Sequence, residues 1–592
     1  MLVLAGPGSG KTFVITRRIL HLIRQHHVKP ESILVITFTR AAALEMKERF
    51  LSLCDGESLP VQFGTFHAIF FSILKEKFHY CSADILKSDE KIKILSEVIH
   101  LEQIHIPIRE ELLEGLLAEF SAMHNTGKSA EDFHSLLVEQ EDYQRIYTAY
   151  TKMTDMLGKL DFDSMIIQCK DLLEKDRELL QKWQSRFEYI LIDEFQDISP
   201  NQYEIIKQLG IPQNNLFIVG DDDQSIYGFR GASPDIMFRF KEDYPDCQQL
   251  FLNVNYRCSG NIVKAAGEII AENNNRFEKE IIPVNPPGDK IKLIAATDKG
   301  KEYKLLAEYL WKEKQQNNLH NCAVICRTSQ YFPMICHFLK QNGIECNCKE
   351  RKNSIRKDEV TLDIMAYLKI AYGNRERKNL FRIMNKPLRY IEREDIGEVF
   401  DLNKICHKYE GKPYIQKSIT ELDKDLNKIS RMSLFLGINY IRKKIGYDEC
   451  LKSKYYNDSI KLEEKLSLCD MIQVLSKGCE DINQLAEMIK ASEGNAAFEK
   501  QTSNQLMLLT LHGSKGLEFE KVFLMDCNEQ NIPHHKARTP NEIEEERRMF
   551  YVGMTRAQKN LFLFYTTGSK TEPVKPSRFL KKMLSTNSFS DK

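Results

Sequence analysis

The segment MLVLAGPGSGKT constrains the possible folds of this chain more than any other stretch of it. An apolar run from Leu2 to Leu4 predicts a buried strand, and apolar residues at helical spacing from Phe13 to Ile23 predict a helix. The glycines between them allow backbone angles that other residues avoid, so successive N–H groups can converge on phosphate oxygens at a helix N-terminus. Strand, loop and helix in this order predict an α/β domain with a phosphate-binding loop.

The residues of this loop have distinct expected roles. Lys11 would reach the β- and γ-phosphates of a nucleotide, and the Thr12 hydroxyl would hold Mg²⁺. Ala5 stands where the strict pattern has glycine, and the loop alone also fits a turn that merely joins a strand to a helix. The residues expected to bind the nucleotide here are Ala5, Gly6, Pro7, Gly8, Ser9, Gly10, Lys11 and Thr12.

Length and composition exclude several classes of protein. A chain of 592 residues, 42% of them hydrophobic, is long enough for several domains and is neither disordered nor fibrous. Lys+Arg and Asp+Glu both total 84, so a polyanion would need a local groove rather than a basic surface overall. The fifteen cysteines include no C-x-x-C pair, which favours thiols in a reducing cytoplasm over zinc ligands. No apolar run approaches the ~18 residues of a membrane span, and the early loop leaves no room for a signal peptide.

Short apolar runs predict further buried strands, and helical patterns lie between most of them. These runs are Ile33 to Phe38, Tyr189 to Ile192, Leu216 to Val219, Ile291 to Ala295, Ala323 to Cys326, Leu506 to Thr510, Val522 to Met525 and Leu561 to Tyr565. Two long stretches break this rhythm with charged, helical patterns, so we expect two domains with parallel sheets, each interrupted by a mostly helical insertion. The expected units are residues 1–77 with 161–252, interrupted by 78–160, and residues 253–348 with 500–580, interrupted by 349–499, before a tail at 581–592.

Acidic residues follow two of the predicted strands. In YILIDEFQD the strand ends at Asp193 and Glu194, at the edge where open α/β sheets bind ligands. Asp193 could share Mg²⁺ with Thr12, and Glu194 could deprotonate an attacking water, although the pair alone also fits a solvated turn or helix cap. In FIVGDDDQSIYGFRGA, Gln224 could hydrogen-bond a γ-phosphate or its water, whereas the aspartates alone fit an exposed turn.

Nine ordered segments resemble the motif series of the UvrD/Rep/PcrA-type DNA helicases of superfamily one. They are GPGSGKT, VITFTRAAALEMKER, GTFHAIF, LDFD, IDEFQD, VGDDDQSIYGFRGA, NYRCSGNI, TLHGSKGLEFE and EEERRMFYVGMTRA, and the matches extend to the PSRFL segment at Pro576 to Leu580. The resemblance implies two RecA-like domains with ATP between them and single-stranded DNA across the top. It also implies a motor that steps 3′ to 5′ along one strand and displaces the other, in repair, recombination or replication.

The same resemblance assigns further site residues. Arg257 and Arg556 match the two arginines that contact the γ-phosphate from the second domain. Tyr256 matches the residue that stacks on adenine, and Glu518 matches the one that bonds the ribose. The residues that match DNA contacts are Phe38, Phe162, Tyr227 and Phe229 near the bases, and Thr37, Thr65, His67, Arg230, His512 and Lys515 along the backbone. At Phe229 the family usually carries Trp, so we expect a weaker grip there.

Three departures from the family pattern matter. Relatives usually carry a segment before the first strand with a glutamine that reads the adenine edge; without it, we expect stacking on Tyr256 to be the main adenine contact and ATP binding to be weaker. Arg40-Ala41 stands where an Asn-Lys pair is usual. Tyr390-Ile391-Glu392 replaces a Gly-Ile-Gly turn that grips duplex DNA, which leaves open whether this turn or the basic stretch from Arg375 to Arg393 contacts a duplex.

The expected protein is an ATP-dependent DNA helicase that uses ATP and Mg²⁺ and acts on single strands and single/double-strand junctions, with repair or replication proteins as possible further partners. Two alternatives stay open: a translocase that clears proteins from single-stranded DNA with little unwinding, and a truncated or inactive helicase-like DNA-binding subunit. A GTPase or small-molecule kinase would fit the first loop but leave the later motifs unexplained. About a dozen residues follow Leu580, so we expect no C-terminal partner-docking or nuclease domain.

Overall fold

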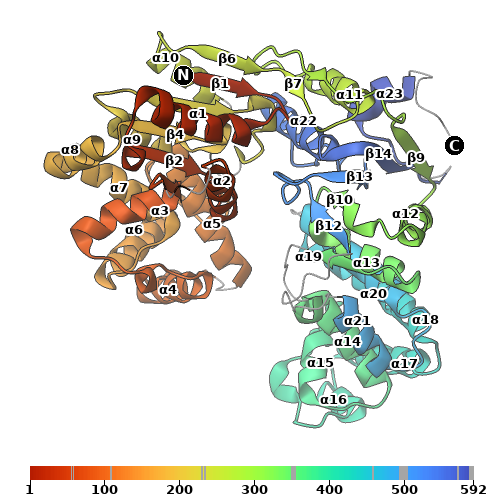
Figure 1. Ribbon diagram of the computed structural model, residues 1–592. Coiled ribbons are helices and arrows are strands. Elements are labelled where there is room, and N and C mark those ends of the chain that lie inside the picture. The colour runs from red at the N-terminus through yellow and green to blue at the C-terminus, as the bar shows by residue number, and fades with distance from the viewer. Residues whose placement is uncertain are drawn as a thin grey trace.

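The computed structural model describes residues 1–54, 57, 59–106, 110–228, 231, 235–348, 355–456, 459–492, 505–569 and 573–585. Within these ranges the chain builds two six-stranded sheets covered by helices, as Figure 1 shows. All paired neighbours in both sheets run parallel. The predicted α/β class with two parallel sheets is therefore confirmed.

The first sheet has the strand order β3-β2-β4-β5-β1-β6. Its strands are β1 (Leu2–Ala5), β2 (Ile33–Thr37), β3 (Gln62–Thr65), β4 (Tyr189–Ile192), β5 (Leu216–Gly220) and β6 (Gln249–Leu252). One face is covered by α1 (Lys11–His26) and α2 (Arg40–Ser52), and the other by α3 (Phe66–Phe78), α7 (Phe162–Lys175), α8 (Arg177–Arg186), α9 (Pro200–Gly210) and α10 (Asp235–Asp243). Within β2, Val35 packs under α1 whereas Leu34 and Ile36 pack on the opposite face. A strand buried on both faces reads as a continuous apolar run, which is why the sequence revealed it.

The second sheet has the strand order β11-β12-β10-β13-β14-β9. Its strands are β9 (Lys292–Ala296), β10 (Cys322–Cys326), β11 (Cys346–Cys348), β12 (Leu506–Thr510), β13 (Phe519–Leu524) and β14 (Ala557–Thr566), preceded by the short pair β7 (Val254–Asn255) and β8 (Ile282–Pro283). Helices α11 (Gly260–Ile270), α22 (Pro540–Met554) and α23 (Lys581–Ser585) pack on one face, and α12 (Lys299–Gln315) and α13 (Phe332–Gln341) pack on the other.

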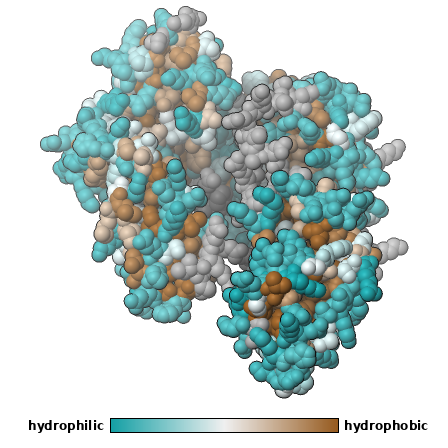
Figure 2. All heavy atoms as spheres, turned by 90° about the horizontal axis from the view of Figure 1, so that it is seen from below, coloured by the Kyte–Doolittle hydropathy of each residue, from teal (hydrophilic) through white to brown (hydrophobic). Residues whose placement is uncertain are grey.

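Two helical units, each with its own hydrophobic core, extend from the sheets. The first contains α4 (Ser88–Leu101), α5 (Glu110–Thr126) and α6 (Gln140–Met156). The second contains α14 (Glu359–Ala371), α15 (Arg377–Ile383), α16 (Leu402–Lys408), α17 (Pro413–Ile429), α18 (Leu434–Asn439), α19 (Tyr447–Lys454), α20 (Ser459–Leu475) and α21 (Ile482–Ser492). In the view from below in Figure 2, hydrophilic residues predominate on the visible surface, with apolar residues between them. No helix in the described ranges combines the length and apolar character needed to cross a membrane.

The strand ends of the first sheet lie beside the part of the chain from residue 253 onward, which we call the second half of the chain. The 3-10 turn Asp222–Gln224, which follows β5, packs against α22 of the second half. The loop after β1 likewise approaches Arg257, as described below. The catalytic groups predicted from distant parts of the sequence therefore meet in one region. The domain boundaries assigned from the sequence stay a prediction.

Candidate active site

The predicted phosphate-binding loop connects β1 to α1. Gly8 and Gly10 have positive φ angles of 65° and 85°, which residues with a Cβ disfavour. A Cβ at Gly8 would lie 2.6 Å from the Cβ of Arg257, so this glycine also lets the second half of the chain approach the loop. The Ser9 hydroxyl donates a hydrogen bond of 2.8 Å to the Gly6 carbonyl and closes the turn. This backbone shape is typical of loops whose N–H groups surround an anion.

The segment Asn255–Arg257 holds the loop from the second half of the chain. Asn255 Nδ2 donates to the Pro7 carbonyl at 2.7 Å, and the Tyr256 N–H donates to the Gly8 carbonyl at 3.0 Å. The Arg257 N–H in turn donates to Asn255 Oδ1 at 2.9 Å. The Tyr256 side chain is 63% exposed beside the loop, where a base could stack on it. The sequence-based prediction omits Asn255, although its place directly before Tyr256 is a signal that could identify it.

Three charged residues meet at the end of β4. Lys11 Nζ, in the first turn of α1 beside Thr12, lies 3.2 Å from Glu194 Oε1. The Asp193 N–H donates to the Ile36 carbonyl at 3.0 Å, which ties this turn to β2. Glu194 has a positive φ of 54°, and its N–H donates to Asp193 Oδ1 at 3.0 Å. This sharp turn sets two carboxyl groups beside the lysine of the phosphate-binding loop.

Burial and neighbouring charges shift the pKa values of these three groups. Burial alone would raise the pKa of Glu194, but the ammonium groups of Lys11 and Lys515 hold that pKa below its usual value. Burial, together with the neighbouring Glu194 charge, raises the pKa of Asp193. Burial opposes the charge of Lys11, yet the nearby carboxylates, Glu194 first, raise its pKa above the usual value. The site therefore holds an ionised Glu194 and a buried Asp193 that lacks full compensation by positive charge.

A chain of hydrogen bonds joins this turn to the second half of the molecule. Gln196 Nε2 donates to Glu194 Oε2, and the Asp221 N–H donates to Gln196 Oε1 at 2.9 Å. Gln224 Nε2 donates to Asp221 Oδ2 at 2.6 Å. Arg556 Nη2 donates to Gln224 Oε1 at 3.2 Å. The chain thus links three predicted catalytic residues through Gln196, which the sequence-based prediction omits.

Arg556 is a buried cation surrounded by neutral acceptors. Its side chain donates to the carbonyls of Val552 at 2.9 Å and Leu517 at 3.1 Å, besides Gln224. No carboxylate in the described part of the chain forms an ion pair with it. Burial and the nearby Arg257 lower its pKa to about 10, so the guanidinium stays charged at neutral pH. Such an arrangement can accept an anionic ligand.

Arg257 and Glu518, predicted to contact the γ-phosphate and the ribose, pair with each other. Arg257 Nε donates to Glu518 Oε2 at 2.6 Å, and the Glu518 side chain is half exposed. Gln558 Nε2 donates to the other Glu518 oxygen at 3.3 Å. Both predicted contacts therefore lie together at the mouth of the loop, and a nucleotide that engages either residue must compete with this ion pair.

The three aspartates after β5, Asp221 to Asp223, are buried. The alternative that they form an ordinary exposed turn is therefore wrong. Lys279 Nζ lies 2.7 Å from Asp221 and 3.1 Å from Asp223, and it also contacts Asp222. Arg276 adds a bidentate pair to Asp223 at 2.9 and 2.8 Å. Both cations come from the second half of the chain. The sequence-based prediction omits them, although three consecutive acids in a buried setting require compensating cations.

Several predicted DNA contacts form an aromatic group beside this network. The Phe38 and Tyr227 rings stack with centroids 5.4 Å apart and 13° between their planes. His512 lies against Tyr227 with centroids 6.1 Å apart. Phe229 and Arg230, also predicted to contact DNA, lie outside the described residues.

A second predicted pair lies at the start of α3 and α7. His67 and Phe162 pack edge to face with centroids 5.2 Å apart, and Phe162 is 48% exposed. The Thr65 hydroxyl accepts a hydrogen bond from the Ala68 N–H and caps α3. Thr37 is buried, and its hydroxyl donates to the Thr39 carbonyl, so this structure does not present it at the surface for a phosphate. The DNA roles of these residues stay predictions.

Lys515 connects the aromatic group to the nucleotide network. Its ammonium group pairs with Asp197, donates to the Gln224 carbonyl at 2.7 Å, and lies 3.9 Å from Glu194. The same group lies 5.1 Å from the centre of the Tyr227 ring. The predicted contact of Lys515 with a DNA phosphate therefore requires this buried lysine to change partners.

Part of the basic stretch of the second helical unit is paired within the protein. Arg382 and Lys386 both pair with the buried Asp363. Arg389 is buried and donates to three backbone carbonyls. Tyr390, at the altered turn, has a positive φ of 56° and is 57% exposed. Arg375, Lys378 and Arg393 are exposed, so only part of this positive charge is held inside the protein.

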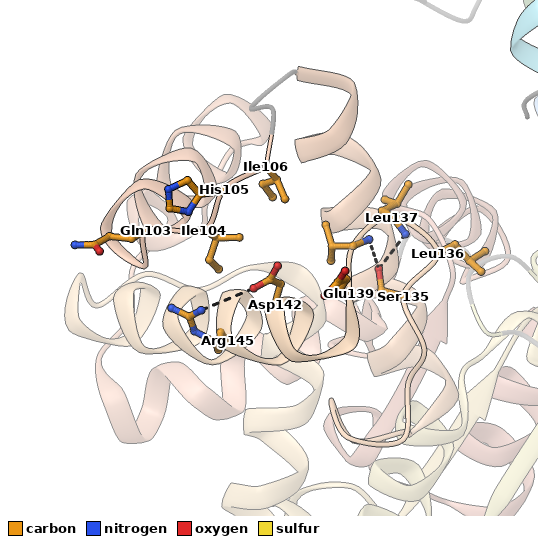
Figure 3. A pocket seen from close by; sticks show the side chains of 11 residues that line it. Gln103, Ile104, His105, Ile106, Ser135, Leu136, Leu137, Glu139, Asp142 and Arg145 are labelled. Atoms are coloured by element: carbon orange, nitrogen blue, oxygen red, sulfur yellow. Dashed lines mark hydrogen bonds and ion pairs between the residues drawn. The ribbon is translucent and has the colours of Figure 1, made fainter. Parts of the chain in front are cut away.

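A hollow of about 660 Å³ lies in the first helical unit and not at the predicted site. In Figure 3, Arg145 pairs with Asp142 on its floor. Arg145 also donates to the Glu102 carbonyl at 2.7 Å, so its charge serves the unit itself. The other lining residues are Gln103, Ile104, His105, Ile106, Ser135, Leu136, Leu137, Val138 and Glu139.

Comparisons with known proteins agree with this geometry. The family model of the UvrD/REP helicase N-terminal domain matches residues 1–245, and that of the UvrD-like helicase C-terminal domain matches residues 250–568. A Staphylococcus epidermidis (strain RP62A) protein named ATP-dependent DNA helicase PcrA is 30% identical over 98% of this chain and 84% of its own length. The Bacillus subtilis (strain 168) protein YjcD is 31% identical over 99% of this chain and 79% of its own length. The chain belongs to the UvrD/REP helicase family.

Proposed function

We propose that the protein is an ATP-dependent DNA helicase that moves 3′ to 5′ along single-stranded DNA and displaces the complementary strand. The observation that carries this proposal is the hydrogen-bond chain from Glu194, beside the phosphate-binding loop, to Arg556 in the second half. It sets catalytic groups on two sides of the space beside the loop, as hydrolysis between two domains requires. The Staphylococcus relative's name supports the same activity. The stepping direction rests on the resemblance of the motif series.

Glu194 serves as the base that accepts a proton from the attacking water. Lys11 Nζ lies 3.2 Å from Glu194 Oε1, and a bound γ-phosphate would compete for the same ammonium group. Losing this cation raises the pKa of Glu194 and makes its carboxylate a stronger base at the moment when substrate is present. The lysine thereby couples occupancy of the loop to the strength of the base.

Mg²⁺ fits the oxygen donors at this site. The Thr12 hydroxyl and the Asp193 carboxylate are hard ligands of the kind that this ion takes alongside phosphates and waters. The raised pKa of Asp193 marks a buried carboxylate in need of positive charge, which a divalent cation would supply. When bound, the ion neutralises charge on the phosphate oxygens.

The second half of the chain completes the site. Charge builds on the γ-phosphate oxygens in the transition state, and Arg556, whose partners are neutral, can stabilise it together with Arg257. Gln224 reports the presence of the phosphate because its side chain already bonds Arg556. Tyr256 stacks on the adenine, and Glu518 bonds the ribose after releasing Arg257.

Single-stranded DNA lies against the exposed aromatic side chains. Stacking on one aromatic platform contributes about 1–3 kcal/mol per base without sequence preference. Phe162 offers an exposed face, whereas Phe38 and Tyr227 cover each other's inner faces, so a base stacks on their outer faces or separates them. We place the protein in the cytoplasm, where free thiols persist, with repair or replication proteins as further partners.

The proposed domain boundaries follow the two sheets. We assign residues 1–77 with 161–252 and residues 253–348 with 500–580 to the two motor domains. Residues 78–160 and 349–499 form the insertions. The separate hydrophobic cores of the helical units support this division.

One observation favours a translocase with little unwinding activity as the second candidate. The turn at Tyr390 lacks the glycines that allow close contact with phosphates. Arg389 is buried, and Arg382 and Lys386 pair with the buried Asp363. An inactive subunit is less favoured, because each predicted catalytic residue is present and Lys11, Glu194, Gln224 and Arg556 lie in contact with one another or with shared partners.

Hydrolysis and strand separation should be measured on the same preparation. The protein is expected to hydrolyse ATP faster with single-stranded DNA and to unwind a 3′-tailed duplex but not a 5′-tailed or blunt one. Lys11→Ala is the inactive control. Hydrolysis without separation of any duplex supports the translocase, unwinding of the 5′-tailed duplex contradicts the proposed direction, and absence of DNA-stimulated hydrolysis contradicts the motor itself.

A further inference from the structure

Three cysteines converge at the edge of the second sheet. Cys346 and Cys348 stand at alternate positions of β11, so both side chains lie on the same face of this edge strand. Cys336 faces them from α13, with its sulfur 3.1 Å from that of Cys346 and 3.3 Å from that of Cys348. All three sulfurs lie within 4.8 Å of one another.

The surroundings of this cluster differ from those of an ordinary core cysteine. Cys169 and Cys527 are fully buried single thiols in apolar cores. The three clustered residues are only partly buried, with their inner sides on the core beneath α12 and α13. Within the described ranges, the hydrogen bonds recorded for these three thiols are to one another. The site is thus lined by three thiols from residues that each keep part of their surface exposed.

We propose that Cys336, Cys346 and Cys348 bind one Zn²⁺ ion, with water or an external ligand in the fourth position. Three convergent sulfurs exceed what a disulfide uses and match the partial ligand set of a zinc site with an open position. With Zn–S bonds of ~2.3 Å, tetrahedral geometry sets the sulfurs about 3.8 Å apart, so the cluster has to open by only about half an ångström. Sequence spacing does not reveal the site, because the sheet brings Cys336 to the other two.

The chemistry separates this site from the nucleotide site. Thiolates select soft or borderline cations such as Zn²⁺, whereas the oxygen donors of Thr12 and Asp193 suit Mg²⁺. The location also gives the ion a structural consequence. Helix α13 packs against α20 and α21 of the second helical unit. Its Met334 packs against the core of the second sheet and against that of the second helical unit. A bound ion ties β11 to α13 at this junction.

Metal content and affinity test the proposal directly. The full-length protein is stripped with a chelator under reducing conditions, and zinc is then titrated in competition with a chromophoric chelator. The wild type is expected to bind one equivalent. Replacing a group that hydrogen-bonds a metal ligand costs about 10–100-fold in metal affinity. Replacing a ligand itself should cost more, so each of Cys336→Ser, Cys346→Ser and Cys348→Ser should lose about 100-fold or more. Cys406→Ser, another partly buried thiol, is the matched control and should bind as the wild type does.

Two further measurements guard against misfolding of the variants. Co²⁺ should produce thiolate-to-metal charge-transfer absorption in the wild type and Cys406→Ser. In the wild type, zinc should also protect the three cysteines from alkylation, as mapped by peptide mass spectrometry. The proposal is overturned if the stripped, reduced wild type takes up no zinc, if the triple serine variant binds it equally well, or if zinc protects other cysteines instead.

Discussion

Lys279→Met removes the cation at the centre of the buried charge cluster that joins the two halves of the molecule. The Lys279 side chain is about 1% exposed, and its ammonium group lies 2.7 Å from Asp221 and 3.1 Å from Asp223 while also contacting Asp222. Methionine keeps the length of the stem and removes only the charge. Arg276 still pairs with Asp223, so at least two buried carboxylates lose their main counter-charge.

The expected loss follows from these distances. At an effective dielectric constant of about 20, attraction at 2.7 and 3.1 Å amounts to roughly 6 and 5 kcal/mol. Desolvation of the lysine offsets most of this, and removing one partner of a buried ion pair typically costs about 3–5 kcal/mol. We therefore expect the free energy of unfolding of the part of the protein built around the first sheet, which we call the first-sheet unit, to fall by about 3–5 kcal/mol at pH 7.5.

The loss should depend on pH in a defined direction. Burial raises the pKa of Asp222 to about 6, above its unfolded value, so the native state binds this proton first and gains stability as pH falls from about 6 to 4. Without Lys279 the aspartate pKa values rise further, because the cation that favoured ionisation is gone. Protonation can then relieve the uncompensated carboxylates of the variant, so its deficit should be smaller at pH 5.5 than at pH 7.5.

Trp183 provides the signal for the measurement. This side chain is 2% exposed in the same core as the first sheet, so its fluorescence reports urea unfolding of that unit. Lys264→Met, which changes an exposed lysine on α11, controls for loss of surface charge. The reasoning is refuted if Lys279→Met unfolds within about 0.5 kcal/mol of the control at pH 7.5, the range of ordinary surface substitutions. A deficit that grows toward pH 5.5 would contradict the assigned sign.

Three further predictions concern the proposed activity. Glu194→Gln should bind ATP and DNA yet turn over about 10²–10⁴-fold more slowly in a steady-state ATPase assay, and near-normal turnover would remove Glu194 as the base. Arg556→Ala should lose about 10³–10⁵ in DNA-stimulated turnover while ATP affinity by equilibrium binding changes little, and Arg538→Ala, on the exposed surface, should match the wild type. Phe162→Ala should weaken single-strand binding, measured by fluorescence anisotropy, by about 1–3 kcal/mol. Phe78→Ala, which removes another exposed aromatic side chain, is the control. Equal losses in the two variants would show that Phe162 is no stacking platform.

The strands that the sequence revealed and those it concealed differ in position. All nine predicted runs, including Leu2 to Leu4, coincide with strands. Most of them lie inside a sheet, where burial on both faces selects continuous apolar residues. Within the two six-stranded sheets, the strands without a prediction are β3, β6 and β11, and each is an edge strand. Their residues are partly exposed, so QFGT, QLFL and CNC carry no comparable apolar signal.

Site residues divide in a similar way. Lys11, Glu194 and Gln224 belong to local patterns in which strand, turn and residue type are adjacent in sequence. Lys279 and Asn255 act on segments more than fifty residues away, so no local pattern carries their role. A zinc motif in a sequence is recognised from cysteines that are close together along the chain. Here the fold brings a third cysteine, from a neighbouring helix, to the two on β11.

The proposed nucleotide site and the proposed DNA contacts lie close together, and this proximity has a physical consequence for the coupling between ATP and DNA. Lys515 lies 3.9 Å from Glu194, donates to the Gln224 carbonyl and sits over the Tyr227 ring, so a single ammonium group contacts parts of both sites. A base that displaces Tyr227, or a phosphate that attracts Lys515, would change the charge felt by Glu194 directly, since the two charges are separated by one contact distance. Communication between DNA and ATP then needs no long path through the protein. A change in whether Lys515 stays with Asp197 is enough to couple the two sites.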